Sequence, residues 1–168
     1  MSTENKFFQL AKNKDIYVIN YFGNRIEFAV LLCSRKTSSL DKEIELLNIS
    51  QKDPIAIIPK TLISNDLQFI QGIIHYYVYR KNMRVFNEGL FLSMLIIGEK
   101  QFKDIVEKLN KEFVKNNDYY LVMYLSNEEL RKKLLCHSFK NCAPYNIVIK
   151  FENLGNVIKN IRTIIELL

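Results

Sequence analysis

The sequence predicts a single α+β domain over residues 1–168, with a small mixed or antiparallel sheet that includes an N-terminal hairpin and is packed by several helices. Its length of 168 residues and its hydrophobic content of 48% suffice for one continuous core. Runs of β-branched and aromatic residues also alternate with stretches of helical periodicity. The order of these segments mixes hairpin connections with longer crossovers, which is typical of an α+β fold.

The first elements expected are two antiparallel strands at residues 16–22 and 26–33. Gly23 and Asn24 lie between them, and this pair favours the tight turn of a hairpin. Residues 1–14, ahead of the hairpin, are expected to be poorly ordered. A short helix should follow the hairpin, with Ser38 or Ser39 as its N-cap.

The middle of the chain predicts one extended segment and three helices. Residues 55–63 are apolar but contain Pro59, which suits an edge strand or an extended connector. The N-cap candidates for the next helix are Ser64, Asn65 and Asp66. The helices are expected at residues 67–81, at 90–97 and from Lys100 to Leu109. The second is apolar nearly all round, which predicts burial on most sides.

The last third predicts two strands and two helices. Residues 118–125 are rich in aromatic and branched side chains, as strands are. Ser126 to Glu129 reads as a capping box that starts a helix ending at Leu134 or Leu135. A second strand is expected at 145–151, and residues 154–168 carry one apolar helical stripe.

The amino-acid composition indicates which kind of partner and which cellular compartment to expect. The net charge of +6 and the pI of about 9.1 favour an anionic partner such as nucleic acid. The three cysteines show no disulfide-framework spacing, so buried thiols in a reducing compartment are expected. The longest apolar runs are far below the roughly 20 residues that span a bilayer, and the N-terminus lacks a signal-peptide pattern. A cytoplasmic protein with no membrane partner is expected.

The segment Gly98-Glu99-Lys100-Gln101 raises the possibility of a phosphate-binding loop. Such a loop needs several glycines and a following Ser or Thr, and this segment has neither. Gly98 is better interpreted as the left-handed end of one helix. The turn would then hold Lys100 and Gln101 at the start of the next helix, where exposed N–H groups can assist an anionic RNA end.

No catalytic set, metal site or cofactor site is expected. Cys136, His137 and Cys142 lie within seven residues, but only Cys33 could complete a zinc site, so unrelated loop residues are the favoured interpretation. His75 lies in an apolar helix and is interpreted as a core or boundary residue. The alternative of a small enzyme with an unrecognised site would require a histidine beside a carboxylate in a cleft.

Cations and aromatic residues gather around the end of the predicted helix 67–81. Cations can contact phosphates and aromatic rings can stack on unpaired bases. The same composition also fits an ordinary basic helix end with core tyrosines. The residues concerned are Tyr76, Tyr77, Tyr79, Arg80, Lys81 and Arg84.

With these elements in order, the chain resembles the small kinase-binding subunit of the KEOPS (EKC) complex, of the archaeal type, over about residues 16–168. The resemblance rests on the strand pair IYVINYF and IEFAVLLC, the segment IIPKTLISNDLQFIQGIIHYYVYRKNMR, the turn LIIGEKQFKDIVEKL, and the stretches YYLVMYLSNEEL and IVIKFENLGNVIKNIRTIIELL. The chain departs from the family pattern at Phe91, where an acid is common, and at Ile96 and Ile97, where small residues are common. Glu88, one helical turn earlier, is a candidate replacement for that acid.

The resemblance implies a noncatalytic accessory protein. Family members bind the small atypical kinase of the complex, which acts mainly as an ATPase, and archaeal members also bind the single-stranded 3′ CCA end of tRNA for threonylcarbamoyladenosine formation. The implied RNA-binding residues are Arg80, Lys81, Arg84, Gly98, Lys100 and Gln101. The kinase surface is expected to be an exposed apolar patch on the helix 90–97 or on the terminal helix. A scaffold that joins the kinase without touching RNA is the alternative.

Overall fold

The structure is a computed structural model that describes residues 8–136 and 138–150. Six strands and five α-helices occur in this part of the chain. The strands are β1 (Phe8–Asn13), β2 (Ile16–Tyr21), β3 (Asn24–Ser34), β4 (Ile55–Pro59), β5 (Asp118–Tyr124) and β6 (Cys142–Pro144). The helices are α1 (Leu40–Leu46), α2 (Leu67–Arg80), α3 (Glu88–Ile97), α4 (Phe102–Lys115) and α5 (Glu128–Leu135), with a 3-10 turn η1 (Lys60–Leu62) after β4. The α+β class expected from the sequence is confirmed.

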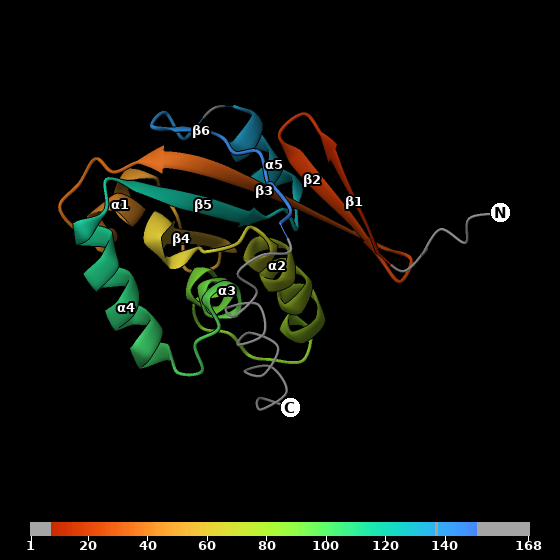
Figure 1. The fold of residues 1–168 in the computed structure, drawn as a ribbon, viewed down its shortest axis with the longest axis horizontal. Coiled ribbons are helices and arrows are strands. Elements are labelled where there is room, and N and C mark those ends of the chain that lie inside the picture. The colour runs from red at the N-terminus through yellow and green to blue at the C-terminus, as the bar shows by residue number, and fades with distance from the viewer. Residues whose placement is uncertain (1–7, 137, 151–168) are drawn as a thin grey trace.

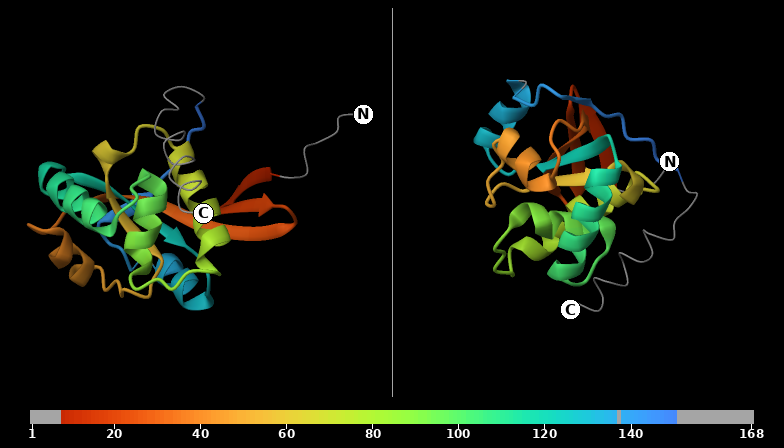
Figure 2. Two further views of the ribbon diagram at one scale, coloured as in Figure 1. Left: turned by 90° about the horizontal axis from the view of Figure 1, so that it is seen from below. Right: turned by 90° about the vertical axis from the view of Figure 1, so that its left-hand side faces the viewer.

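All strand pairs are antiparallel, in the order β1-β2-β3-β5-β4. The long strand β3 organises the sheet, because β2 pairs with its first half and β6 pairs with Leu31–Cys33 further along. Its other edge pairs with β5. Figure 1 shows α2, α3 and α4 below this sheet and α5 above it, with the β1-β2 hairpin extending to one side. The two turned views in Figure 2 show the same layers.

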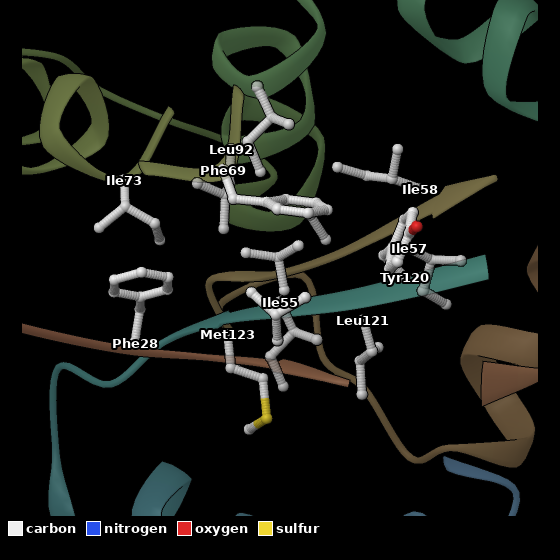
Figure 3. Packing of buried hydrophobic residues seen from close by; sticks show 14 of the residues in the cluster. Phe28, Ile55, Ile57, Ile58, Phe69, Ile73, Leu92, Tyr120, Leu121 and Met123 are labelled. Carbon is white, nitrogen blue, oxygen red and sulfur yellow. The ribbon is translucent and has the colours of Figure 1, made fainter. Parts of the chain in front are cut away.

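The core lies between the sheet and the α2-α3 pair. Side chains from β3, β4 and β5 meet those from the two helices in Figure 3, with Phe28 and Phe69 among the largest that are fully buried. Gly72 allows the helices to approach closely, because a Cβ built at this position would lie 2.3 Å from Cγ1 of Ile96. Helix α3 is buried over Phe91–Ile97, as its apolar surface predicted.

Several local expectations are confirmed. Gly23 adopts a positive φ of 79° between β2 and β3, and Ser39 caps α1 by accepting from the backbone N–H of Lys42. Pro59 ends β4, which is an edge strand of the sheet. Helix α2 has the expected extent, although Asp66 at its N-cap position makes no capping bond. The amide oxygen of Asn65 accepts from the N–H of Leu67 instead.

Four expectations are corrected. Residues 8–13 form β1, because they pair in full register with β2, so the disorder expected for 1–14 is wrong for this part. The cap of α5 is Asn127 rather than Ser126. The strand expected at 145–151 is replaced by β6 at Cys142–Pro144, after which Tyr145 keeps one backbone bond to Val30. The terminal helix expected at 154–168 lies outside the described residues.

The fourth correction concerns the cysteines. Cys33 and Cys142 form a disulfide, so the expectation of buried thiols is wrong for both. They lie opposite each other on β3 and β6 and are 109 residues apart in the sequence. Only the strand register brings them together, so their spacing along the chain gave no signal. Cys136 is a free thiol, but it is exposed, so the expectation of a buried thiol is wrong here as well.

Candidate nucleic-acid interface

A surface hollow of about 280 Å³ lies where the C-terminal end of α2 meets the start of α3. The end of β5 and the loop before β4 complete it. Its lining combines tyrosines and cations and is formed by Lys52, Pro54, Tyr76, Tyr77, Arg80, Lys81, Glu88, Tyr124 and Ser126. The aromatic and basic residues that the sequence singled out at the end of α2 therefore border a concave surface.

An ion pair between the buried Glu88 and the partly exposed Arg80 forms part of the wall of the hollow. Glu88 is only 6% exposed, and its carboxylate accepts from Nε of Arg80 at 2.6 and 2.8 Å and from the hydroxyl of Tyr76 at 2.6 Å. Burial and the hydrogen bond to Glu88 raise the pKa of Tyr76, and the same carboxylate raises the pKa of Arg80. Arg80 also donates to the carbonyl of Met83. Its charge is thus largely committed to joining α2 and α3.

The remaining cations lie at the rim. The ammonium of Lys81 lies 4.4 Å from the centre of the Tyr77 ring and donates to the Tyr77 hydroxyl at 3.2 Å. Lys52 is exposed on the loop before β4. Three cations against the single acid Glu88 give the lining a net charge of +2. Two further lining residues, Tyr76 and Tyr124, have ring centres 4.8 Å apart.

The structure separates the predicted RNA-binding residues into two groups. Arg80 and Lys81 line the hollow, and Arg84 follows on the exposed loop 81–87 without lining it. The other group lies at the opposite end of the antiparallel α2-α3 pair, where Nε2 of Gln68 contacts the carbonyl of Ile96 at 3.4 Å. Gln68 and Arg80 are separated by about 18 Å along α2 at 1.5 Å per residue.

The second group has the geometry that the sequence predicted. Gly98 ends α3 in the left-handed conformation, at φ 83° and ψ 35°, and its N–H donates to the carbonyl of Met94. Gln101 is the exposed N-cap of α4 but makes no side-chain capping bond, and Lys100 beside it is also exposed. Glu99 forms a 2.5 Å ion pair with Lys108, which keeps an acid at this turn.

Sequence reasoning missed Lys52, Tyr124 and Ser126. Lys52 belongs to the loop after α1, and the other two belong to the end of β5 and the residues after it. These segments reach α2 only because β4 and β5 are neighbours in the sheet. No local pattern in the sequence indicates that these segments lie next to α2.

The expected kinase surface on the helix 90–97 is wrong, because Phe91–Ile97 are buried against the sheet and α2. The other predicted location, the terminal helix, lies outside the described residues. Large exposed apolar side chains occur instead beside the hollow, where Met83 is 41% and Phe86 is 83% exposed on the loop 81–87.

Within the described residues, the side chains considered for catalysis and metal binding do not form a common site. Nδ1 of His75 is buried without a hydrogen-bond partner, and burial lowers the pKa of this histidine to about 4. Cys142 is consumed in the disulfide, and His137 lies outside the described residues. Among residues 8–136 and 138–150, no group of three or more His, Cys, Asp or Glu side chains is placed to hold a metal ion.

No helix in the described part of the chain combines the length and the apolar character needed to cross a membrane. In comparisons with known proteins, no family model matches the chain, and no curated protein matches it significantly. The geometry of the hollow and of its surroundings therefore carries the functional argument.

Proposed function

We propose that the protein is a noncatalytic accessory subunit of a KEOPS-type tRNA-modification complex in the cytoplasm. In this role it binds the complex's atypical kinase/ATPase subunit and holds the single-stranded 3′ CCA end of tRNA. The observation that carries the proposal is the hollow at the end of α2, which combines tyrosine rings with a net positive lining. Concave surfaces of this composition suit unpaired nucleotides, because every base has a face that can stack and every phosphate needs a cation.

The mechanism is delivery rather than bond making. Lys52 and Lys81 would contact phosphates, and Lys81 would leave the Tyr77 ring to do so. That movement would free the Tyr77 ring for stacking on a base. Arg80 would act indirectly, since its pairing with Glu88 fixes the wall of the hollow. Partner subunits would supply ATP and the threonylcarbamoyl chemistry.

The exposed loop 81–87 supports a second candidate, a scaffold that joins the kinase subunit without touching RNA. Phe86 and Met83 give this loop an apolar surface of the kind that partner proteins cover. Both activities can coexist, because Lys81 lines the hollow and Met83 and Phe86 lie further along the same loop. The two candidates differ in whether charge at the hollow affects tRNA affinity.

The test is a tRNA-binding titration with intact tRNA and with tRNA that lacks CCA, at two salt concentrations. Lys52→Glu and Lys81→Glu should each weaken binding of intact tRNA by about tenfold and reduce the salt slope by about one. Lys111→Glu on the exposed face of α4 is the matched control, because it makes the same charge change away from the hollow.

Equal affinity for both tRNAs would rule out the CCA-binding role. Unchanged affinity in both hollow variants, with co-purification of the kinase subunit retained, would favour the scaffold. Loss of that co-purification in Phe86→Ser, with tRNA binding intact, would place the kinase contact on the loop 81–87. Failure of the wild-type protein both to bind tRNA and to co-purify with a kinase subunit would end the proposal.

A further inference from the structure

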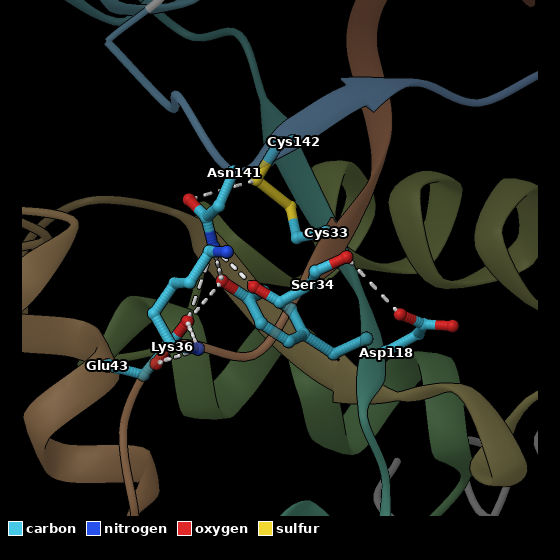
Figure 4. Close-up of a disulfide and its surroundings, with 8 residues drawn as sticks. Cys33, Ser34, Lys36, Glu43, Asp118, Asn141 and Cys142 are labelled. Atoms are coloured by element: carbon cyan, nitrogen blue, oxygen red, sulfur yellow. Dashed lines mark hydrogen bonds between the residues drawn. A yellow bond between two sulfur atoms is a disulfide. The ribbon is translucent and has the colours of Figure 1, made fainter.

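Residues 141–150, here called the strap, begin beside the part of β3 that β2 leaves uncovered and continue past β2 to the start of α2. The strap contains β6, which pairs with Leu31–Cys33, and two further backbone bonds join Ser34 to Asn141 and Tyr145 to Val30. Figure 4 shows the Cys33–Cys142 disulfide crossing between the two strands. One covalent bond therefore fixes the strap near its beginning.

Hydrogen bonds hold the rest of the strap to distant elements. The hydroxyl of Tyr17 on β2 donates to the carbonyl of Tyr145 and accepts from the N–H of Ile147. At the start of α2, the carboxylate of Asp66 accepts from the Tyr145 hydroxyl at 2.9 Å and from the N–H of Val148 at 2.7 Å. The strap thus connects the disulfide to the N-terminus of α2.

The two cysteine residues differ in their exposure to solvent. Cys33 is 1% exposed in the core, whereas Cys142 is partly exposed. Cys142 also borders a small surface hollow of about 30 Å³, together with Leu134 at the end of α5 and Phe139. Cys142 is therefore the more accessible of the two cysteines to an external thiol, whereas Cys33 is shielded in the core.

We propose that the Cys33–Cys142 disulfide is a reversible latch that a dithiol reductant opens and that controls attachment of the strap to β3. A thiolate of the dithiol attacks Sγ of Cys142, forming a mixed disulfide and releasing the Cys33 thiolate, which takes up a proton. The second thiol of the reductant then displaces Cys142 as a thiol. Two electrons and two protons pass from the dithiol, which becomes a disulfide, and the protein gains two thiols.

Opening the latch changes the surface of the molecule. Without the strap, the backbone of β3 from Val30 to Ser34 would present an unpaired edge, which is a template for another strand. Disulfides in a reducing compartment are usually transient and regulatory, so the proposed location suits a latch rather than a permanent link. The chemistry itself is independent of tRNA or kinase binding.

The first measurement counts thiols in the full chain by alkylation in denaturant, before and after reduction with dithiothreitol. One labelled cysteine is expected before reduction, and three after it. Cys136→Ser should remove the single label of the unreduced protein, because Cys136 is the free thiol. Three labels in protein that was alkylated without prior reduction would overturn the proposal.

The second measurement is hydrogen exchange of the Ser34 and Tyr145 amides, which donate across the contact between β3 and the strap. Reduction should accelerate exchange at both by about tenfold or more, and reoxidation should restore it. Amides of β5 should keep their protection. Unchanged exchange in the strap, or equal acceleration in β5, would overturn the proposal. Cys142→Ser should reproduce the reduced state, and reduction of the wild type remains a test if that variant does not fold.

Discussion

At the scale of single residues, the role of a charged side chain depends more on its contacts in the fold than on its position in the sequence. The sequence suggests Arg80 as an RNA contact, yet its guanidinium is paired with a carboxylate that is almost fully buried. Removing the cation that faces a buried carboxylate leaves that charge without its partner, which is costly even though Arg80 itself is partly exposed. The same residue type four positions later, Arg84, is exposed on a loop.

This contrast predicts different stabilities for two arginine variants. Arg80→Ala should lower the free energy of unfolding by about 2 to 3 kcal/mol, because Glu88 stays buried without its cation. Arg84→Ala, the control, should change it by less than about 0.5 kcal/mol. Urea unfolding at pH 7 measures both. If the two variants lost equal stability, the ion pair would have no structural role, whereas restoration by Arg80→Leu with Glu88→Leu would support it.

His75 gives a pH dependence with a defined sign. Its folded-state pKa is lowered to about 4, below the ordinary value of 6.5, because its imidazole is largely buried. As pH falls below 6.5, the unfolded chain takes up the proton first, so stability is lost between pH 6.5 and 4. Partial exposure of the ring reduces the expected loss at pH 5 to about 1 kcal/mol.

The variant His75→Met should remove this contribution. The stability difference between pH 7 and pH 5, measured by urea unfolding, should be smaller in the variant than in the wild type by about 1 kcal/mol. Titration of other groups is common to both proteins and cancels in the comparison. An unchanged difference would mean that the His75 ring is protonated at its ordinary pKa.

At the scale of elements, the spacing of α2 and α3 determines the hollow. Gly72 permits that spacing, since a Cβ there would also lie 2.9 Å from the backbone Cα of Ile96. At the other end of the pair, Arg80 and Tyr76 from α2 meet Glu88 from α3. A change in helix separation would therefore alter the wall of the candidate site.

Gly72→Ala should destabilise the protein although alanine is the better helix former by about 1 kcal/mol. The clash with a backbone atom cannot be relieved by rotation of a side chain, so a net loss of about 2 kcal/mol or more is expected. Lys111→Ala on the exposed face of α4 should be neutral or slightly stabilising. Thermal unfolding followed by circular dichroism compares them. A Gly72→Ala protein as stable as the wild type would show that the helices separate at little cost.

At the scale of the whole molecule, the sequence predicted the turns and helix ends that depend on residues close together in the chain. The β2-β3 hairpin turns at Gly23, Ser39 caps α1, and Gly98 ends α3, each as its local pattern indicated. The disulfide, the strap and the contribution of Lys52 to the hollow were not predicted. They depend on strand order, which joins residues far apart in the sequence, 109 positions for the disulfide, and leaves no periodic signal. Half of the predicted RNA-binding set consequently lies at the far end of α2.

The last prediction tests whether the strap closes as one unit. Tyr17→Phe removes both hydrogen bonds between β2 and the strap and leaves the N–H of Ile147 without its acceptor, so a loss of about 1 to 2 kcal/mol is expected. In a Cys142→Ser background the same change should cost clearly less, because the strap has already lost its covalent attachment. Urea unfolding of the two single variants and of the double variant gives the coupling energy, for which about 1 kcal/mol is expected. Additive losses would mean that the disulfide and Tyr17 hold the strap independently. Coupled losses would mean that one latch governs the contacts from β3 to the N-terminus of α2.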